Sequence, residues 1–274
     1  MTWVIMPVLD NCAESLQAIS DVLTQDVPTT LLVVDQGSSD ETRDALRRLA
    51  GAERRVLLWL HDPCLPSLSA TWNRALDFVW QQDEDAALVI NNDLRLHPST
   101  VRVLVRTLVH DHALFVSATG VGEEGWQVAN SDWASRVMNE HNLAQRGGPD
   151  FSCFLMSRAC HEKYRFDENY APAYCEDIDL HRQILLAGEG HRIYALNFPF
   201  LHVGSGTLRS LAPEKREALH RRLAGTRRYF ASQWGGDCNH ETYLRKGDPT
   251  SAVEDGTATT PWLQYHREDR HEPA

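Results

Sequence analysis

The sequence predicts an α/β fold built on a mostly parallel sheet that helices cover on both faces. Short apolar runs alternate with helical patterns over the first 120 residues. The apolar runs are continuous, as in strands buried on both faces. In such sheets the functional side chains stand at the carboxyl ends of the strands. The predicted strands are Trp3–Val8, Thr30–Val34, Val56–Leu60, Ala86–Ile90 and Leu114–Ala118.

Helical patterns separate these strands, and local chemistry marks where the helices begin and end. Ser39 precedes two carboxylates that favour a helix N-terminus, and Pro98 suits a first helical position. Gly188 ends a further helix that begins near residue 176. The expected helices cover residues 13–25, 40–50, 67–81, 98–110 and 176–187.

The chain after residue 210 is predicted to hold one long helix and a polar segment. Pro213 opens an amphipathic pattern whose apolar stripe includes Phe230 and Trp234, and two glycines end it. The following residues are polar and rich in Gly, Pro and Thr. We therefore expect a domain over residues 1–210, a helix over 211–237 packed on it, and a polar tail or lid over 238–274.

The composition is that of a packed, acidic chain of enzyme size. Of 274 residues, 42% are hydrophobic and 24% are charged, close to globular averages. A net charge of −11 disfavours sequence-independent binding to nucleic acid but leaves it as a minority alternative. Six scattered cysteines without a Cys-x-x-Cys pair predict reduced thiols. With no signal-like segment, and no apolar run near the roughly 20 residues that cross a bilayer, we expect a cytoplasmic protein without a transmembrane segment.

A first candidate site follows the second predicted strand, where Asp35 precedes a Gly37-Ser38-Ser39 turn and a new helix. A carboxylate at a strand end can accept hydrogen bonds from a base or a ribose, and a helix N-terminus attracts phosphate. The alternative is structural, with Asp35 ending a strand and Asp40 capping a helix. No Gly-x-Gly-x-x-Gly fingerprint follows any of the first four predicted strands, where a dinucleotide-binding enzyme would carry it, and the Gly-Lys-[Ser/Thr] loop that binds triphosphates is absent from the sequence, which argues against both classes.

Two further strand ends carry candidate metal ligands. Asn91-Asn92-Asp93 follows the fourth strand, and His202 ends an apolar strand. Hard cations prefer oxygen ligands, and one or two protein carboxylates suffice when phosphates and water complete the shell. Asp93 is therefore a candidate ligand for Mg²⁺ or Mn²⁺, and His202 could complete the ligand shell of the metal. The competing interpretations are turn chemistry for the first motif and a structural role for the histidine.

Three carboxylates crowd the first turn of the helix predicted near residue 176: Glu176, Asp177 and Asp179. Their repulsion is costly unless a cation, the helix dipole or a proton offsets it, and it can poise one carboxylate as a general base. The competing interpretation is helix capping, with Asp179 forming a surface pair with Arg182 or Gln183.

Taken in order, these motifs resemble the family 2 glycosyltransferases of GT-A fold, and among them the rhamnosyltransferase-like branch. The resemblance runs from residue 3 to about residue 207. It is carried by Val4-Ile5-Met6-Pro7 with Asn11, the segment 34–42, Asn73, Asn91-Asn92-Asp93, the segment 154–158, Phe166-Asp167-Glu168, the segment 176–180 with Arg182 and Gly188, and His202 with Gly204 and Ser205.

The resemblance implies a role for the residues at these positions. Asp35 would bind the base of a nucleotide-sugar donor, while Asp93 and His202 would hold Mn²⁺ or Mg²⁺ at its diphosphate. Asp177 would be the catalytic base, and Glu176 would orient the acceptor. The nucleotide-sugar-binding residues would be Pro7, Leu9, Asn11, Asp35, Ser38, Asn73, Asn91 and Asn92.

The resemblance also implies a reaction: an inverting hexosyl- or deoxyhexosyltransferase, with a nucleotide-sugar half over about 1–120 and an acceptor half over about 121–210. The expected acceptor is a glycan or a lipid-linked saccharide, with a hydroxylated base in nucleic acid as a minority alternative. The candidate acceptor residues are Trp126, Trp133, Asp150 and Phe151, and core packing is the alternative for the aromatic ones.

A rival function from another class is a non-catalytic nucleotide-sugar binding protein. Asn91 stands where the family has an aspartate, and the lower ligand charge would then have cost the chain its metal. A sugar nucleotidyltransferase finds no support, because no Gly-rich N-terminal loop ending in Arg or Lys is present in the sequence. Metal-dependent hydrolysis or transfer of a labelled donor would distinguish the glycosyltransferase from the binding protein.

Overall fold

The computed structural model describes residues 1–61, 63–128, 149–202, 213–238 and 240–253. The chain divides into two compact units. Unit 1 comprises Met1–Leu65, Thr71–Lys163 and Arg192–Ala212, and unit 2 comprises Pro66–Ala70, Tyr164–His191 and Pro213–Ala274. Trp133 and residues 254–274 of the predicted tail lie outside the described residues.

Unit 1 is built on an eight-stranded, mixed sheet in the described part of the chain, with the order β3-β2-β1-β4-β7-β6-β8-β5. Strands β1, β2, β3 and β4 are parallel neighbours, and β6 and β8 are also parallel. β7 is antiparallel to both β4 and β6, and β5 is antiparallel to β8. This arrangement confirms the predicted mostly parallel α/β fold. The strands are β1 (Thr2–Val8), β2 (Thr29–Asp35), β3 (Val56–Leu60), β4 (Ala86–Ile90), β5 (Leu94–Arg95), β6 (Phe115–Val121), β7 (Cys153–Ser157) and β8 (Ile193–His202).

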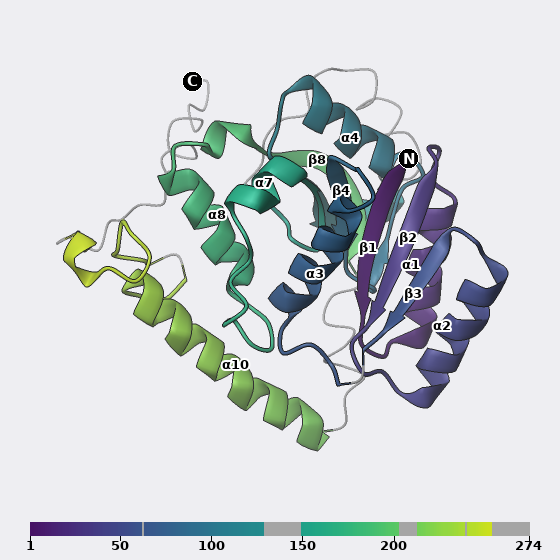
Figure 1. Ribbon diagram of the computed structural model, residues 1–274, viewed down its shortest axis with the longest axis horizontal. Coiled ribbons are helices and arrows are strands. Elements are labelled where there is room, and N and C mark those ends of the chain that lie inside the picture. The colour runs from purple at the N-terminus through teal and green to yellow at the C-terminus, as the bar shows by residue number, and fades with distance from the viewer. Residues whose placement is uncertain (62, 129–148, 203–212, 239, 254–274) are drawn as a thin grey trace. The chain divides into compact units, whose positions relative to one another are not determined.

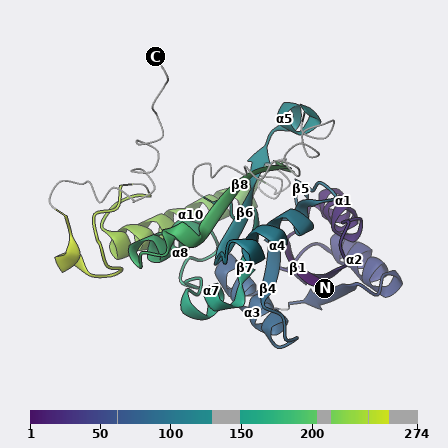
Figure 2. The ribbon, with the colours of Figure 1, turned by 90° about the horizontal axis from the view of Figure 1, so that it is seen from above.

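Both faces of this sheet are covered by helices, and the alternation of side chains along β1 shows how. Val4 and Met6 point to one face, where they join a core cluster with residues of α1 (Cys12–Leu23), α2 (Asp40–Ala52) and α4 (Thr100–His110). Trp3 points to the other face and meets the ring of Phe78 from α3 (Leu68–Trp80) at 5.6 Å. The helices on either side of β1 and β4 can be followed in Figures 1 and 2.

Burial on both faces explains why the strands could be predicted from continuous apolar runs. Every residue of β2 is buried, and the one carboxylate in it, Asp35, lies at the carboxyl end. Two short helices, α5 (Glu123–Val128) and α7 (Arg158–Lys163), follow β6 and β7. The parallel strands β1, β2 and β4 thus bring the loops that follow them to one edge of the sheet.

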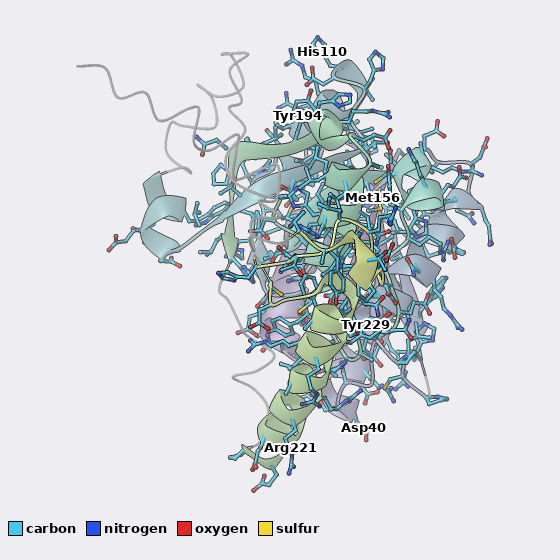
Figure 3. The ribbon with its side chains drawn as sticks, turned by 90° about the vertical axis from the view of Figure 1, so that its left-hand side faces the viewer. Asp40, His110, Met156, Tyr194, Arg221 and Tyr229 are labelled. Atoms are coloured by element: carbon cyan, nitrogen blue, oxygen red, sulfur yellow. The ribbon has the colours of Figure 1, made fainter. Side chains whose placement is uncertain are left out.

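Unit 2 has its own small core between two helices, α8 (Glu176–Leu186) and α10 (Pro213–Trp234). Tyr170, Cys175, Phe230 and Trp234 form its buried cluster. Tyr229 of α10 donates a hydrogen bond to Asp167 at 2.9 Å, whereas other side chains of α10 are exposed. Figure 3 labels Tyr229 and Arg221 on this helix. Among the described side chains of α10, the exposed basic ones are Arg221, Arg222, Arg227 and Arg228.

A single carboxylate, Asp179, links the elements of unit 2. It is fully buried, and it accepts hydrogen bonds from Trp234 Nε1 at 2.8 Å and from Tyr170 Oη at 3.1 Å. Lys246 Nζ lies 2.9 Å from the same carboxylate, and Gln183 Nε2 donates to it at 2.7 Å. The competing interpretation of Asp179 as part of a surface pair is correct in its partner Gln183 but wrong in its location, because packing against α10 removes this carboxylate from solvent.

The described part of the predicted tail is docked within unit 2. Arg182, also buried, donates through Nη2 to the carbonyl oxygen of Tyr243 at 2.8 Å, and its Nη1 lies 3.6 Å from the Glu241 carboxylate. The guanidinium stands over the ring of Trp234 at 4.9 Å. Burial lowers the pKa of Arg182. Residues 240–253 are thus held by hydrogen bonds and charge, although their composition is polar.

No helix among the described residues is long and apolar enough to cross a membrane.

Replacing Asp179 by Asn removes a buried negative charge and breaks part of this network. We expect the free energy of unfolding to fall by about 2 kcal/mol, because the amide nitrogen of Asn is itself a donor and cannot accept from Gln183 or Lys246. Urea denaturation measures the loss. The matched control is Glu217→Gln on α10, where the carboxylate is exposed and the change should stay within about 0.5 kcal/mol. Equal stability of the two variants would contradict this role for Asp179.

Candidate active site

The carboxyl end of β2 holds Asp35 in a closed network. The carboxylate is fully buried and accepts hydrogen bonds from the backbone N–H groups of Gly37 at 3.3 Å and Ser38 at 3.0 Å. Arg43 Nε donates to it at 2.7 Å, and the Arg43 side chain is 19% exposed. Three donors use three of about four lone-pair sites on the carboxylate. Asp35 therefore fixes the turn and the Arg43 guanidinium, and contact with a nucleotide base stays a prediction.

The loops after β1, β2 and β4 are tied to one another by hydrogen bonds. The Asp10 N–H donates to Ser38 Oγ at 2.8 Å, and the Ser39 N–H donates to Asp10 Oδ1 at 2.7 Å. Asn92 Nδ2 donates to Ser15 Oγ at 2.8 Å and to the Asp10 carbonyl oxygen at 3.3 Å. The structure thus brings predicted residues Ser38 and Asn92 to the loop that carries Asn11.

Asn11 lies in a strained part of this loop. Asp10 and Asn11 have φ angles of 54° and 58°, in the left-handed region that costs non-glycine residues energy. The Asn11 Nδ2 atom is buried and has no hydrogen-bond partner among the described residues. A buried amide donor without a partner is costly, so a ligand acceptor at this position would stabilise it.

His61, at the carboxyl end of β3, is a candidate site residue that the sequence analysis missed. Its Nε2 atom is buried without a hydrogen-bond partner among the described residues. Its backbone N–H donates to the Asp35 carbonyl oxygen at 3.4 Å, so it stands beside the Asp35 network. Burial, and then the nearby charge of Arg74, lower the pKa of His61, while Asp35 opposes the shift. The rule that strand ends carry function would have found this histidine.

Asp93 and His202 come together, as the resemblance implies. Asp93 immediately precedes β5, and His202 is the last residue of β8. The two strands are paired so that Leu94 stands opposite His202. His202 Nε2 lies 3.6 Å from Asp93 Oδ1, and Asp93 is 6% exposed. The Asp93 carboxylate is the main cause that raises the pKa of His202, with a smaller contribution from Asp150, while burial opposes the shift.

This pair fits a divalent cation as part of a shell. One carboxylate and one imidazole are too few for a closed site, and among the described residues no group of three His, Cys, Asp or Glu side chains is placed to hold a metal. A shell completed by phosphate and water oxygens needs only one or two protein ligands. The donor set therefore suits a cation that arrives with a diphosphate.

The predicted acceptor residues that the structure describes have structural roles. Asp150 accepts from the backbone N–H groups of Gly120 at 3.2 Å and Ser152 at 2.9 Å. A Cβ atom at position 120 would lie 2.8 Å from Asp150 Oδ2, so the close approach requires glycine there. Phe151 packs on the ring of Phe115 at 4.8 Å, and Trp126 is buried. Phe151 therefore contributes to the core.

Asn73 is 1% exposed and bonded inside the protein. The indole N–H of Trp80 donates to His161 Nδ1 at 2.9 Å, and indole has no acceptor. His161 therefore carries its proton on Nε2, which donates to Asn73 Oδ1 at 3.1 Å. The predicted contact of Asn73 with a nucleotide sugar is not visible in this arrangement and stays a prediction.

In unit 2, the first turn of α8 gives its three carboxylates different environments. Asp179 is the buried, fully bonded carboxylate described above. Glu176 is 4% exposed, and its Oε2 atom has no hydrogen-bond partner among the described residues. Burial, followed by the charges of Asp177 and Asp179, raises the pKa of Glu176 well above its usual range. Asp177 is half-buried, and its Oδ1 accepts from the Ile178 N–H at 2.8 Å.

The backbone before this turn is also strained. Tyr174 and Cys175 have φ angles of 75° and 73°, in the left-handed region. Side-chain crowding makes two such residues in succession uncommon, and strain of this kind gathers at functional sites. The half-exposed Tyr174 and the half-buried Asp177 thus flank a buried thiol and a buried carboxyl at the start of α8.

The sequence profile described as Glycosyl transferase family 2 matches residues 3–164 of the chain. Among curated proteins, no sequence match was found. The matched segment contains β1 to β4 and the loops that carry Asn11, Asp35 and Asp93, but it ends before α8 and His202.

Several solved structures share the fold. A mannosyltransferase from Pyrobaculum calidifontis, in complex with GDP-Man and Mn²⁺, superimposes with a TM-score of 0.55 at 17% identity over 81% of this chain and 60% of that one. TarS 1–349 from S. aureus with UDP-GlcNAc gives 0.53 at 17% identity over 82% and 66%. Glucosyl-3-phosphoglycerate synthase from Mycobacterium tuberculosis, with Mn²⁺ and UDP, gives 0.53 at 19% identity over 82% and 78%. The chain thus spans 60% of the length of the mannosyltransferase.

Because the pKa of Glu176 is raised in the folded state, its ionisation opposes folding. Below the unfolded pKa of about 4.3, both states bind the proton and no penalty applies. As the pH rises through the folded pKa, the penalty becomes complete. We therefore expect Glu176→Gln to gain stability relative to the wild type between pH 5 and pH 8, as measured by urea denaturation at both values. Glu217→Gln should show no such gain, and a pH-independent difference for Glu176→Gln would contradict the raised pKa.

Proposed function

The chain belongs to glycosyl transferase family 2, and we propose that it is an inverting glycosyltransferase that moves a sugar from a nucleotide-diphosphate donor to an acceptor hydroxyl. The observation that carries the proposal is the Asp93–His202 pair, because a carboxylate and an imidazole 3.6 Å apart at a sheet edge suit a cation that arrives with a diphosphate.

The loops after β1, β2 and β3 would receive the nucleoside of the donor. Asn11 and His61 both present buried polar atoms without a hydrogen-bond partner among the described residues. Arg43 is fixed by Asp35 and also donates through Nη2 to the His61 carbonyl oxygen at 3.4 Å. A bound base would satisfy the orphaned atoms of Asn11 and His61, which supports this placement.

Asp93 and His202 would hold the cation, with Asn91 nearby as a neutral oxygen ligand in place of a carboxylate. An imidazole nitrogen in the donor set favours Mn²⁺ over Mg²⁺, because Mg²⁺ takes oxygen ligands almost exclusively. When bound, the metal neutralises charge on the departing diphosphate. Two of the superimposable structures hold Mn²⁺, which agrees with this choice.

Asp177 is the proposed general base. Inversion requires a base that takes the proton from the acceptor hydroxyl while this oxygen attacks the anomeric carbon and the nucleoside diphosphate leaves on the opposite face. Glu176, with its raised pKa, retains its proton to higher pH, and a protonated carboxyl donates a hydrogen bond rather than accepting a proton. The environments thus favour Asp177 as the base and Glu176 as the group that orients the acceptor.

The remaining details of the substrates are also proposals. We infer transfer of a hexose or deoxyhexose, as in the rhamnosyltransferase-like branch, to a glycan or a lipid-linked saccharide, in a cytoplasmic setting. A hydroxylated base in nucleic acid remains the minority alternative, since the exposed arginines of α10 are the main basic feature that favours it.

A second candidate function is nucleotide-sugar binding without transfer. The observation that favours it is the sparse donor set: Asn91 stands where the family has an aspartate, and in the described part of the chain no third His, Cys, Asp or Glu side chain forms a metal site with Asp93 and His202. Such a protein would bind the donor without consuming it. Turnover in the presence of Mn²⁺ separates this function from transfer.

Replacing Asp177 by Asn should lower the turnover number by at least about 100-fold, because general-base catalysis contributes roughly 10²–10⁴. Donor affinity should stay unchanged, since the base acts on the acceptor. Release of nucleoside diphosphate from a labelled donor measures turnover, and calorimetry measures binding. Glu217→Gln serves as the control carboxylate, and full activity of Asp177→Asn would sink this assignment.

Replacing Asp93 by Asn should weaken Mn²⁺ binding at least about tenfold, since even the partners of metal ligands contribute that much. Binding is measured by calorimetry in the presence of a nucleoside diphosphate. Asp44→Asn on the exposed face of α2 is the matched control and should bind Mn²⁺ like the wild type. Unchanged affinity in Asp93→Asn would remove this residue from the metal site.

A further inference from the structure

Two thiols meet in unit 2, directly beside the proposed base. Cys175 Sγ and Cys238 Sγ lie 3.5 Å apart and share a hydrogen bond. Cys175 is the residue before α8 and is 6% exposed, whereas Cys238 follows the end of α10 and is half-buried. Neither thiol takes part in the function proposed above.

The two thiols differ in pKa and in exposure, which suits one for attack on a disulfide and the other for resolution of the mixed disulfide. The hydrogen bond between the two thiols is the main cause that lowers the pKa of Cys238, although burial and the nearby carboxylates Glu241 and Asp177 oppose the shift. The same hydrogen bond and burial raise the pKa of Cys175. The thiolate is the reacting form of cysteine, so the more exposed Cys238 is the attacking group and the buried Cys175 is the resolving one.

We propose that Cys175 and Cys238 form a redox modification site that closes into an intrachain disulfide in the presence of a disulfide oxidant such as oxidised glutathione. The sulfurs need to approach by about 1.5 Å to reach the bond length of roughly 2.05 Å. Both cysteines lie outside helices, one just before α8 and one after α10, so the approach does not break a helical hydrogen-bond ladder.

The reaction balances in two steps. The Cys238 thiolate attacks one sulfur of oxidised glutathione, which forms a mixed disulfide and releases the first glutathione as a thiolate. Cys175 then loses its proton and its sulfur attacks the Cys238 sulfur, which breaks the mixed disulfide and releases the second glutathione as a thiolate; the two protons from the protein thiols pass through water to the two glutathione thiolates. Two protein thiols are oxidised, and one oxidised glutathione is reduced to two molecules of glutathione.

The closed disulfide would join the first turn of α8 to the end of α10. Cys175 immediately precedes Glu176 and Asp177, and its backbone is already in the left-handed region, with φ at 73°. Tightening this connection changes the position of both carboxyls. An effect of the disulfide on catalysis rests on the proposed function, because it acts through Glu176 and Asp177. The formation of the disulfide itself does not depend on that function.

The test uses the full chain, first reduced and then incubated with oxidised glutathione, with mass spectrometry as the readout. We expect the protein to lose the mass of two hydrogen atoms, a proteolytic digest to contain a peptide that links Cys175 to Cys238, and dithiothreitol to reverse both changes. Stable glutathione on Cys238 without release would overturn the proposal, and so would reaction at the exposed Cys64 alone.

Two variants sharpen the result without requiring activity. In Cys238→Ser the linked peptide should vanish, while in Cys64→Ser its yield should equal that of the wild type, because Cys64 is the exposed thiol outside the pair. Circular dichroism confirms that both variants are folded. A linked peptide that persists in Cys238→Ser, or vanishes in Cys64→Ser, would contradict the assignment. Because mass reports the bond directly, failure here is distinguishable from failure of the proposed transferase activity.

Discussion

The parallel pairing of β1 with β2 and β4 is the constraint on which the donor side of this protein depends. Parallel strands end at the same edge, so the register that sets Val8 opposite Asp35 also gathers the loops after β1, β2 and β4. Hydrogen bonds among Asp10, Ser38 and Asn92 then hold these loops together, and the strained φ angle of Asp10 is maintained by them. The polar side chains at this edge are therefore positioned by the hydrophobic core that packs on the sheet.

Unit 2 shows how environment sorts chemically identical groups. Asp179 is surrounded by donors and serves as a structural link, whereas Glu176 is buried without a partner at Oε2 among the described residues and has a raised pKa. Asp177 keeps partial exposure. A cluster that would be costly if all members were ionised is thus resolved into one bonded carboxylate, one that favours its proton, and one suited to act as a base. Cys175 of the neighbouring thiol pair immediately precedes this turn, and the charge of Asp177 acts on both thiols.

Much of the fold and part of the candidate site could be predicted because they rest on local patterns. The strand over residues 30–34 is continuous and apolar, and the helix that begins at Asp40 has a clear start signal. The insertion of β7 between β4 and β6 could not be predicted, because strand pairing depends on packing between distant segments. Likewise, the burial of Asp179 could not be predicted, because its partner Lys246 is 67 residues away in the sequence. His61 was missed because a single histidine after a strand carries a weak signal until its burial is known.

The most direct test of the central claim is a donor screen by thermal unfolding. The folded protein is heated with UDP-, GDP-, dTDP-, ADP- or CMP-sugars, each with and without Mn²⁺. A ligand that binds only the folded state raises the melting temperature, and the account predicts such a rise for one nucleotide sugar, only when Mn²⁺ is present. A rise of equal size without metal would contradict the Asp93–His202 assignment. The absence of any rise with every donor would contradict the nucleotide-sugar site itself.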